Sequence, residues 1–162
     1  FNIDFIIKDS TSGGYTSSGD LSRGAFIVAI ENLFLLTTEK KIFGLGLGNC
    51  EIKTIFADET PFFRRYGSLH YDWFASMHTF IEQGWLGLSF YVAFFCMVIF
   101  LTYRIGKKYK IDQFYVKLTY LYGILFFLVF FYNQTLRQDI ACFVAFCLAM
   151  PFILKKDEML EV

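Results

Sequence analysis

The fold is decided by residues 85–103, WLGLSFYVAFFCMVIFLTY, a run of 19 residues that contains no charged side chain. A helix of this length covers a hydrocarbon core of about 30 Å. Residues 114–132 form a second run of the same length, and its single charge, Lys117, lies one turn from the start, within reach of the membrane interface. A third run, residues 140–154, is shorter and carries Pro151, so we expect a short or tilted span there. The pattern predicts an all-α, polytopic membrane protein with three transmembrane helices.

The composition agrees with a membrane protein. Hydrophobic residues make up 56% of the 162 residues and charged residues 19%, against about 25% in ordinary soluble domains. These values exclude a disordered chain, a collagen-like chain and a disulfide-stapled mini-protein. Buried core helices of a large soluble protein are the alternative interpretation, but uncharged runs of this length, back to back, favour the membrane. Lys plus Arg and Asp plus Glu both total 15, so the net charge argues neither for nor against nucleic acid. For a membrane protein of this kind we expect no nucleic-acid partner.

The positive charges predict the orientation of the spans. Short loops that are rich in Lys and Arg remain in the cytoplasm. Such residues gather between the first two runs and after the third: Arg104, Lys107, Lys108 and Lys110, then Lys155 and Lys156. We therefore expect residues 155–162 to form a cytoplasmic tail and residues 1–84 to lie on the outer side.

Residues 1–84 read as a large outer loop with structure of its own. A Ser- and Gly-rich stretch, residues 9–20, precedes a helix that we expect to begin at an N-cap, Ser22, and to run to about Leu36. This helix is apolar nearly all round, so it lies against the membrane or packs under other elements. A Gly-rich turn follows, and a further helix from about Asp72 leads into the first span. No signal peptide is visible at Phe1, and we expect the chain to be a piece of something longer.

One histidine is a candidate for chemistry. His78 lies in MHTFIEQGWLGL, residues 77–88, and Glu82 follows four residues later, on the same face of a helix. An imidazole partnered by a carboxylate at the membrane surface can act as a general base on a hydroxyl. The alternative is an interfacial histidine that only makes hydrogen bonds. His70 would share a metal with His78 only through unusual geometry, and no short ligand spacing is present.

Arginines on the expected outer side form a second candidate set: Arg23, Arg64, Arg65 and Arg137. A planar guanidinium holds phosphate oxygens in pairs, which suits a lipid-linked pyrophosphate. The alternatives are that these arginines are simply solvated or pair with acidic residues. Arg64 and Arg65 could also anchor the chain at the membrane surface. The glycines of residues 44–49, GLGLGN, fit no nucleotide-binding loop, and they allow tight backbone packing or close approach of a ligand.

Taken in order, three motifs resemble a known family. SRG at residues 22–24 precedes KIFGLGLGN at residues 41–49, and MHTFIEQGWLGL then leads straight into a span. This order resembles the C-terminal half of the O-antigen ligase and polymerase family of bacterial membrane proteins. Thr79 stands where family members usually have Asn after the motif histidine, and the Trp common after the loop-opening arginine is absent.

The resemblance implies glycosyl transfer on the periplasmic face of the bacterial inner membrane. The donor would be a glycan on polyprenyl diphosphate, such as undecaprenyl diphosphate, and a glycan or lipid hydroxyl would be the acceptor. By position, His78 would be the base or would orient the acceptor, and Arg23 would hold the diphosphate. Arg137 would add a second clamp, with Arg64, Arg65 and Glu82 as further substrate contacts. The resemblance implies no bound metal and no cofactor.

Alternative functions remain open at this level. A polymerase joins lipid-linked repeat units and would work with membrane lipids and a chain-length regulator, whereas a ligase transfers finished glycan to a lipid A core or a protein. A non-enzymatic transporter or flippase of the same sugars would connect its spans by short loops. A sensor or scaffold would carry a separately folding outer domain, which the apolar helix after Ser22 disfavours.

Overall fold

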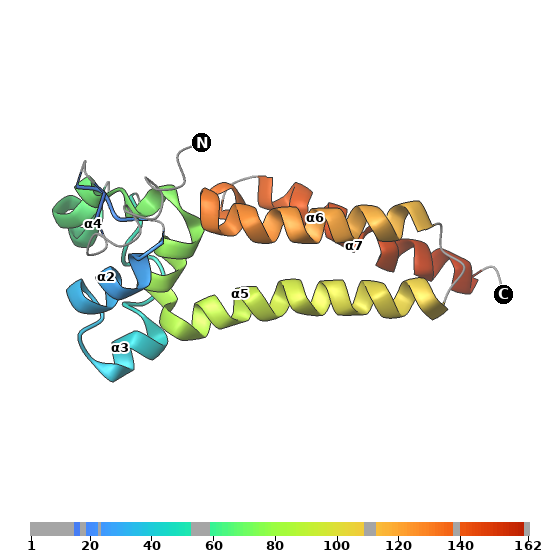
Figure 1. The fold of residues 1–162 in the computed structure, drawn as a ribbon, viewed down its shortest axis with the longest axis horizontal. Helices are drawn as coiled ribbons and strands as arrows, with labels where there is room; N and C mark the ends of the chain where they lie inside the picture. The colour runs from blue at the N-terminus through green and yellow to red at the C-terminus, as the bar shows by residue number, and fades with distance from the viewer. Residues whose placement is uncertain are drawn as a thin grey trace. The chain divides into compact units, whose positions relative to one another are not determined.

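The structure of the chain is a computed structural model (Figure 1). It describes residues 15–16, 19–22, 24–52, 59–108, 113–137 and 140–160, with the backbone alone at residues 140 and 155–160. Apart from one bridge between Tyr15 and Leu21, the regular elements of this described part are helices, as predicted. The helices are α2 (Phe26–Leu33), α3 (Thr38–Phe43), α4 (Pro61–Tyr66), η1 (Gly67–Leu69), η2 (Tyr71–Trp73), α5 (Ala75–Lys108), α6 (Gln113–Tyr132), η3 (Thr135–Arg137) and α7 (Ile140–Leu160).

The chain divides into two compact units. The first consists of Phe1–Ser89 with Phe131–Gln134, and the second of Phe90–Phe130 with Thr135–Val162. The division falls within α5, so this helix contributes its first part to one unit and its second part to the other.

Two helices, α5 and α6, are long and apolar enough to cross a membrane. The bounds of α6 agree with the predicted 114–132 to within one residue. α5 begins ten residues before the predicted span and contains one non-helical residue, Gly84, at φ 60° and ψ −153°. In α7 the apolar part is the shorter Ala141–Leu154, so a third span is not confirmed, although the helix itself continues past Pro151 to Leu160.

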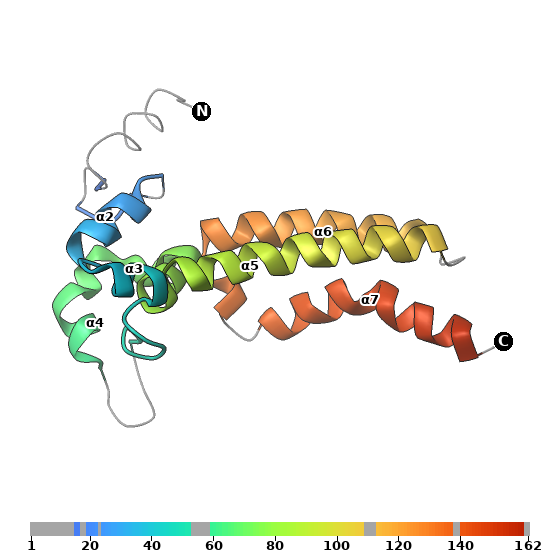
Figure 2. The ribbon, with the colours of Figure 1, turned by 90° about the horizontal axis from the view of Figure 1, so that it is seen from below.

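Apolar side chains hold the second unit together. Phe95 and Val98 of α5 contact Phe126 of α6 and a group from α7, and both views show α6 running beside this part of α5 (Figures 1 and 2). The group from α7 consists of Val144, Cys147 and Leu148. Many other large side chains of these helices, such as Phe90 and Leu121, are exposed. An apolar surface of this kind suits lipid or further membrane helices.

The first helix differs from the prediction. α2 begins at Phe26 after Ala25, which makes no side-chain cap, and it ends at Leu33. Ser22 lies before the helix and is buried, so its assignment as the N-cap is wrong. The reason is tertiary: the amide of Leu21 donates to the carbonyl of Leu69 at 3.2 Å, which ties this backbone to the chain near η1 instead of to the helix.

Parts of the predicted outer loop lie outside the described residues. These are positions 9–14 and 17–18 of the Ser- and Gly-rich stretch. Lys110, which belongs to the predicted cytoplasmic connection, also lies outside the described residues. Within the described part, α2 buries Phe26, Ala29 and Ile30.

Candidate functional site

The candidate site is built where the Gly-rich turn, residues 44–49, packs against α5 just before Gly84. Two amides of the turn donate to carbonyls of α5: Leu45 to Ile81 and Gly46 to Glu82, both at 2.9 Å. Carbonyls near the end of a helical segment lack partners within the helix. The break at Gly84 therefore leaves carbonyl groups that the turn can bind, and the turn is joined to the helix backbone to backbone.

Glycine is required on both sides of this contact. A Cβ added at Gly44 would lie 2.2 Å from the carbonyl carbon of Glu82, and one added at Gly84 would lie 2.4 Å from the carbonyl oxygen of Lys41. Both glycines also have positive φ, which other residues adopt at a cost. Of the two uses that the sequence left open for the glycines of residues 44–49, tight backbone packing is the one seen at Gly44.

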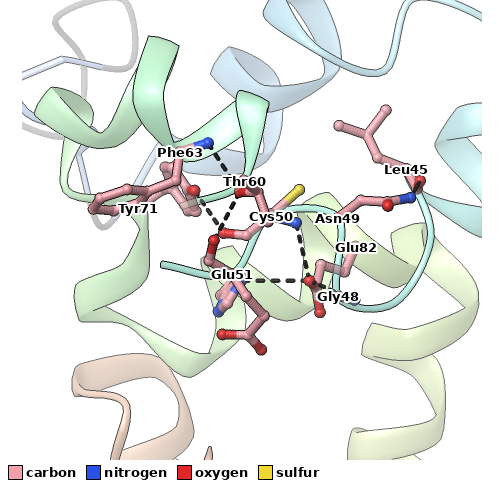
Figure 3. Close-up of polar contacts among 10 residues, drawn as sticks. Leu45, Gly48, Asn49, Cys50, Glu51, Thr60, Phe63, Tyr71 and Glu82 are labelled. Carbon is pink, nitrogen blue, oxygen red and sulfur yellow. Dashed lines mark hydrogen bonds and ion pairs between the residues drawn. The ribbon is translucent and has the colours of Figure 1, made fainter. Parts of the chain in front are cut away.

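The Glu82 side chain anchors the far end of the turn. The residue is 2% exposed, and its Oε1 accepts from the amides of Gly48 at 2.9 Å and Cys50 at 3.3 Å (Figure 3). Burial raises the pKa of this carboxyl, the nearby charge of Glu51 raises it further, and the two amide bonds act in the opposite direction. Glu82 precedes the Gly84 break and lies outside the predicted span 85–103.

His78 lies on the same face of α5, as the spacing of four residues predicts. It is 3% exposed, and its Nε2 lies 3.6 Å from Oε1 of Glu82, too far for a hydrogen bond. Nε2 has no hydrogen-bond partner among the described residues. The ring of Tyr71 packs edge-on against the imidazole at 5.7 Å. This buried nitrogen is able to accept a proton or to bind a cation, and Glu82 would stabilise the positive charge.

Glu51 completes the cluster and was not predicted from the sequence. One ligand atom each from Glu51, His78 and Glu82 lie within 4.8 Å of one another. We call these three residues the His78 cluster. In the sequence, Glu51 is one acidic residue among many, and only its place directly after the Gly-rich turn distinguishes it.

Backbone contacts fix Glu51 beside the histidine. The Thr60 hydroxyl donates to the Glu51 carbonyl and the Tyr71 hydroxyl to the Cys50 carbonyl, both at 2.7 Å (Figure 3). Burial is the main cause that raises the pKa of Tyr71, so its hydroxyl remains a donor. With the Glu82 bonds, these contacts hold residues 48–51 along the face of α5 that carries His78.

A polar clamp adds support at the Gly84 break. The Trp85 indole donates to Oε1 of Glu31 at 2.8 Å, and the Lys41 ammonium lies 3.1 Å from Oε2. These two hydrogen bonds, that of Trp85 first, lower the pKa of Glu31. The clamp therefore links α2 and α3 to α5 at the same place where the turn binds.

The four arginines predicted as diphosphate contacts belong to different parts of the chain. Arg23 lies outside the described residues. Arg64 and Arg65 are exposed on α4, where Arg64 approaches Glu59 at 3.6 Å and Arg65 lies over the ring of Tyr66. Arg137 ends η3 in the second unit and is partly buried.

The second histidine does not belong to the cluster. Nδ1 of His70 lies 2.6 Å from Asp20, and its ring packs against Trp73 with the centroids 4.1 Å apart. His70 is therefore paired with other residues, and the carboxylates of Glu51 and Glu82 are the groups that lie near His78. Compared with known protein families, curated proteins and solved structures, the chain matches none.

Proposed function

We propose that the chain is part of a membrane glycosyltransferase that joins glycan repeat units carried on polyprenyl diphosphate at the periplasmic face of a bacterial inner membrane. The observation that carries the proposal is the state of His78. Its Nε2 is buried, has no hydrogen-bond partner among the described residues, and lies beside a buried carboxylate. A base held in this way, next to an apolar helix, suits chemistry on a lipid-linked substrate.

The reaction assigned to this site is a single displacement. An acceptor hydroxyl oxygen forms a bond to the anomeric carbon of the donor glycan, while the bond from that carbon to the diphosphate oxygen breaks. Nε2 of His78 takes the hydroxyl proton, and the polyprenyl diphosphate leaves with the electron pair of the broken bond. Glu82 favours the imidazolium that forms, because an opposite charge nearby stabilises the protonated ring.

Positive charge for the leaving diphosphate is assigned to arginines. Arg64 and Arg65 are exposed on α4 and present guanidinium groups to the surroundings. Arg23 and Arg137 remain proposed contacts of the diphosphate. Guanidinium groups hold phosphate oxygens in bidentate pairs, so each such contact would stabilise the charge that develops on the leaving oxygen.

The proposed orientation follows from charge on α5. Lys107 and Lys108 lie in its last turn, and the His78 cluster lies near its start. Because Lys and Arg favour the cytoplasmic side, the cluster is assigned to the periplasmic side. The proposed topology includes α7 as a third span, with the C-terminus in the cytoplasm.

The segment before the span is held in a fixed structure by hydrogen bonds, and this favours an enzyme over a transporter. Five hydrogen bonds fix the Gly-rich turn and the two glutamates. The amides of Leu45 and Gly46 donate to the carbonyls of Ile81 and Glu82, the amides of Gly48 and Cys50 donate to the Glu82 carboxylate, and the Thr60 hydroxyl donates to the Glu51 carbonyl. A fixed constellation of this kind is what a catalytic group requires, whereas a transporter needs only short connections between spans.

The test uses the full protein in a strain from which its gene is deleted. Wild-type protein and His70→Ala should restore a ladder of surface glycan lengths, whereas His78→Ala should insert normally in the membrane and give none. Loss of the ladder with one unit still attached identifies a polymerase, and loss of all attachment identifies a ligase. A normal ladder from His78→Ala would remove the histidine from the mechanism.

A further inference from the structure

The atoms of the His78 cluster have the spacing of ligands on one cation. Nε2 of His78 and Oε1 of Glu82 lie 3.6 Å apart, and with Glu51 included all three ligand atoms are within 4.8 Å of one another. Two ligands bonded to a tetrahedral Zn²⁺ at about 2.1 Å are roughly 3.4 Å apart. The distance of 3.6 Å is close to this value, and rotation of the Glu51 and Glu82 carboxylates would bring one oxygen of each to the same cation as Nε2.

The histidine itself gives an independent indication of a ligand. His78 is 3% exposed, and its Nε2 makes no hydrogen bond within the described residues. A buried ring nitrogen without a partner is costly, because it has lost its bond to water and gained none in return. A cation between the imidazole and the two carboxylates would supply the missing interaction.

The surroundings resemble those of ligands that are held for a metal. Oε1 of Glu82 is oriented by the amides of Gly48 and Cys50, and the backbone of Glu51 is held by the hydroxyl of Thr60. Ligating carboxylates are commonly oriented by such outer hydrogen bonds. Oε1 of Glu82 uses its two lone pairs for these amides, so a cation would be bound through Oε2 of the same carboxylate.

Charge also favours a cation. One carboxylate oxygen of Glu51 and one of Glu82 lie within 4.8 Å of each other and of a nitrogen of the His78 ring, and Glu82 is buried. Burial of adjacent like charges is unfavourable, and a divalent cation would neutralise both.

We propose that Glu51, His78 and Glu82 form a binding site for a divalent first-row transition metal of the Zn²⁺ or Mn²⁺ kind. An imidazole nitrogen among the ligands favours these metals over Mg²⁺ and Ca²⁺, which prefer oxygen ligands alone. Three protein ligands leave a coordination position open for water or a substrate oxygen, as in catalytic rather than structural sites. The site was not anticipated from the sequence, and the family resemblance implied no bound metal.

Metal binding does not depend on the proposed glycosyl transfer. If His78 is also the base of that reaction, a cation and a proton compete for Nε2. This consequence rests on the proposed function, whereas the binding experiment does not.

The experiment measures binding alone, on the full-length protein purified in detergent and stripped of metal with a chelator. Co²⁺ is titrated while its visible absorption is recorded, and Zn²⁺ is then added as the competitor. We expect one saturable Co²⁺ spectrum that Zn²⁺ abolishes and that a large excess of Mg²⁺ leaves in place.

Matched variants assign the ligands. Glu51→Gln and His78→Gln should each weaken Co²⁺ binding by about 100-fold or more, since even outer contacts of a metal ligand are worth 10- to 100-fold. Glu51→Gln keeps the size of the side chain and the backbone bond to Thr60, so it should fold normally. The controls are Glu39→Gln, on the exposed surface of α3, and His70→Gln, and both should bind as wild type does.

The outcomes separate the two proposals. No saturable binding, or binding that Glu51→Gln and His78→Gln leave unchanged, would overturn the metal site, whatever the effect of His78→Ala on glycan. Binding that these variants abolish would establish the site even if His78→Ala made a normal glycan ladder, a result that would overturn only the glycosyl transfer.

Discussion

Substitution of Gly44 by Ala should disrupt the contact between the Gly-rich turn and α5. The new Cβ would lie 2.2 Å from the carbonyl carbon of Glu82 and 2.4 Å from the amide nitrogen of Gln83, both backbone atoms. Ordinary carbon contacts begin near 3.4 Å, so the turn must move away by about 1 Å. A movement of this size breaks the hydrogen bonds from Leu45 and Gly46 to α5.

The magnitude follows from two terms. Gly44 has φ 73° and ψ −160°, a region essentially restricted to glycine, where a residue with a Cβ costs about 1–3 kcal/mol. Each of the two lost backbone bonds contributes about 0.5–1.5 kcal/mol net. Gly44→Ala should therefore lower the free energy of unfolding of the first unit by about 2–6 kcal/mol.

Gly48→Ala is the matched control. Gly48 has φ +78°, close to the +73° of Gly44, but a Cβ there would meet nothing within 4 Å, and its amide would still donate to Glu82. It should therefore lose only the backbone term, about 1–2 kcal/mol. Both variants are compared by thermal unfolding of the full protein in one detergent, followed by tryptophan fluorescence. Equal losses in the two variants would refute the backbone-to-backbone contact.

Three further changes test the supports of the site. Glu82→Ala leaves the amides of Gly48 and Cys50 without their acceptor and should cost about 1–3 kcal/mol for the buried Cys50 amide and less for the partly buried Gly48 amide, whereas Glu82→Gln keeps an oxygen acceptor and should recover most of that stability in the same unfolding assay. The pKa of Glu31 is lowered in the folded protein, so the ionised carboxylate stabilises the fold fully above the ordinary pKa of 4.5, and this stabilisation is lost as the pH falls through the lowered pKa. Between pH 7 and pH 3 the free energy of unfolding should fall by roughly 1 kcal/mol or less from this group, and Glu31→Gln should abolish that part of the pH dependence. Thr60→Val removes both the cap of α4 and the donor to Glu51, and should lower stability by about 1–2 kcal/mol; a melting temperature equal to that of wild type would contradict this role.

The long apolar helices were predictable because a run of consecutive apolar residues identifies them without any knowledge of tertiary contacts. A run with one charge in 19 residues predicted α6 to within one residue, and the uncharged run 85–103 predicted the part of α5 that follows Gly84. The helix predicted from about Asp72 into the span corresponds to α5, which begins at Ala75, although the break at Gly84 was not predicted. The third span stays a prediction, because the apolar part of α7 is shorter than the other two.

The site was only partly predictable. The four-residue spacing placed Glu82 beside His78, because a helix repeats every 3.6 residues. The role of the Gly-rich turn depends on its contact with carbonyls of Ile81 and Glu82, far along the chain, and no local pattern encodes that contact. Glu51 was missed for the same reason. The Ser22 cap was wrong because a tertiary hydrogen bond at Leu21 outweighs the local preference of serine for a helix start.

The most direct test of the account is glycan assembly by the purified full-length protein, supplied with polyprenyl-diphosphate-linked repeat units. Wild-type protein and His70→Ala should lengthen the glycan and release polyprenyl diphosphate in equal steps. His78→Ala should be slower by at least about 100-fold, the smallest effect usually expected for loss of a general base. A rate for His78→Ala equal to that of His70→Ala would contradict the assignment of the buried imidazole as the catalytic group.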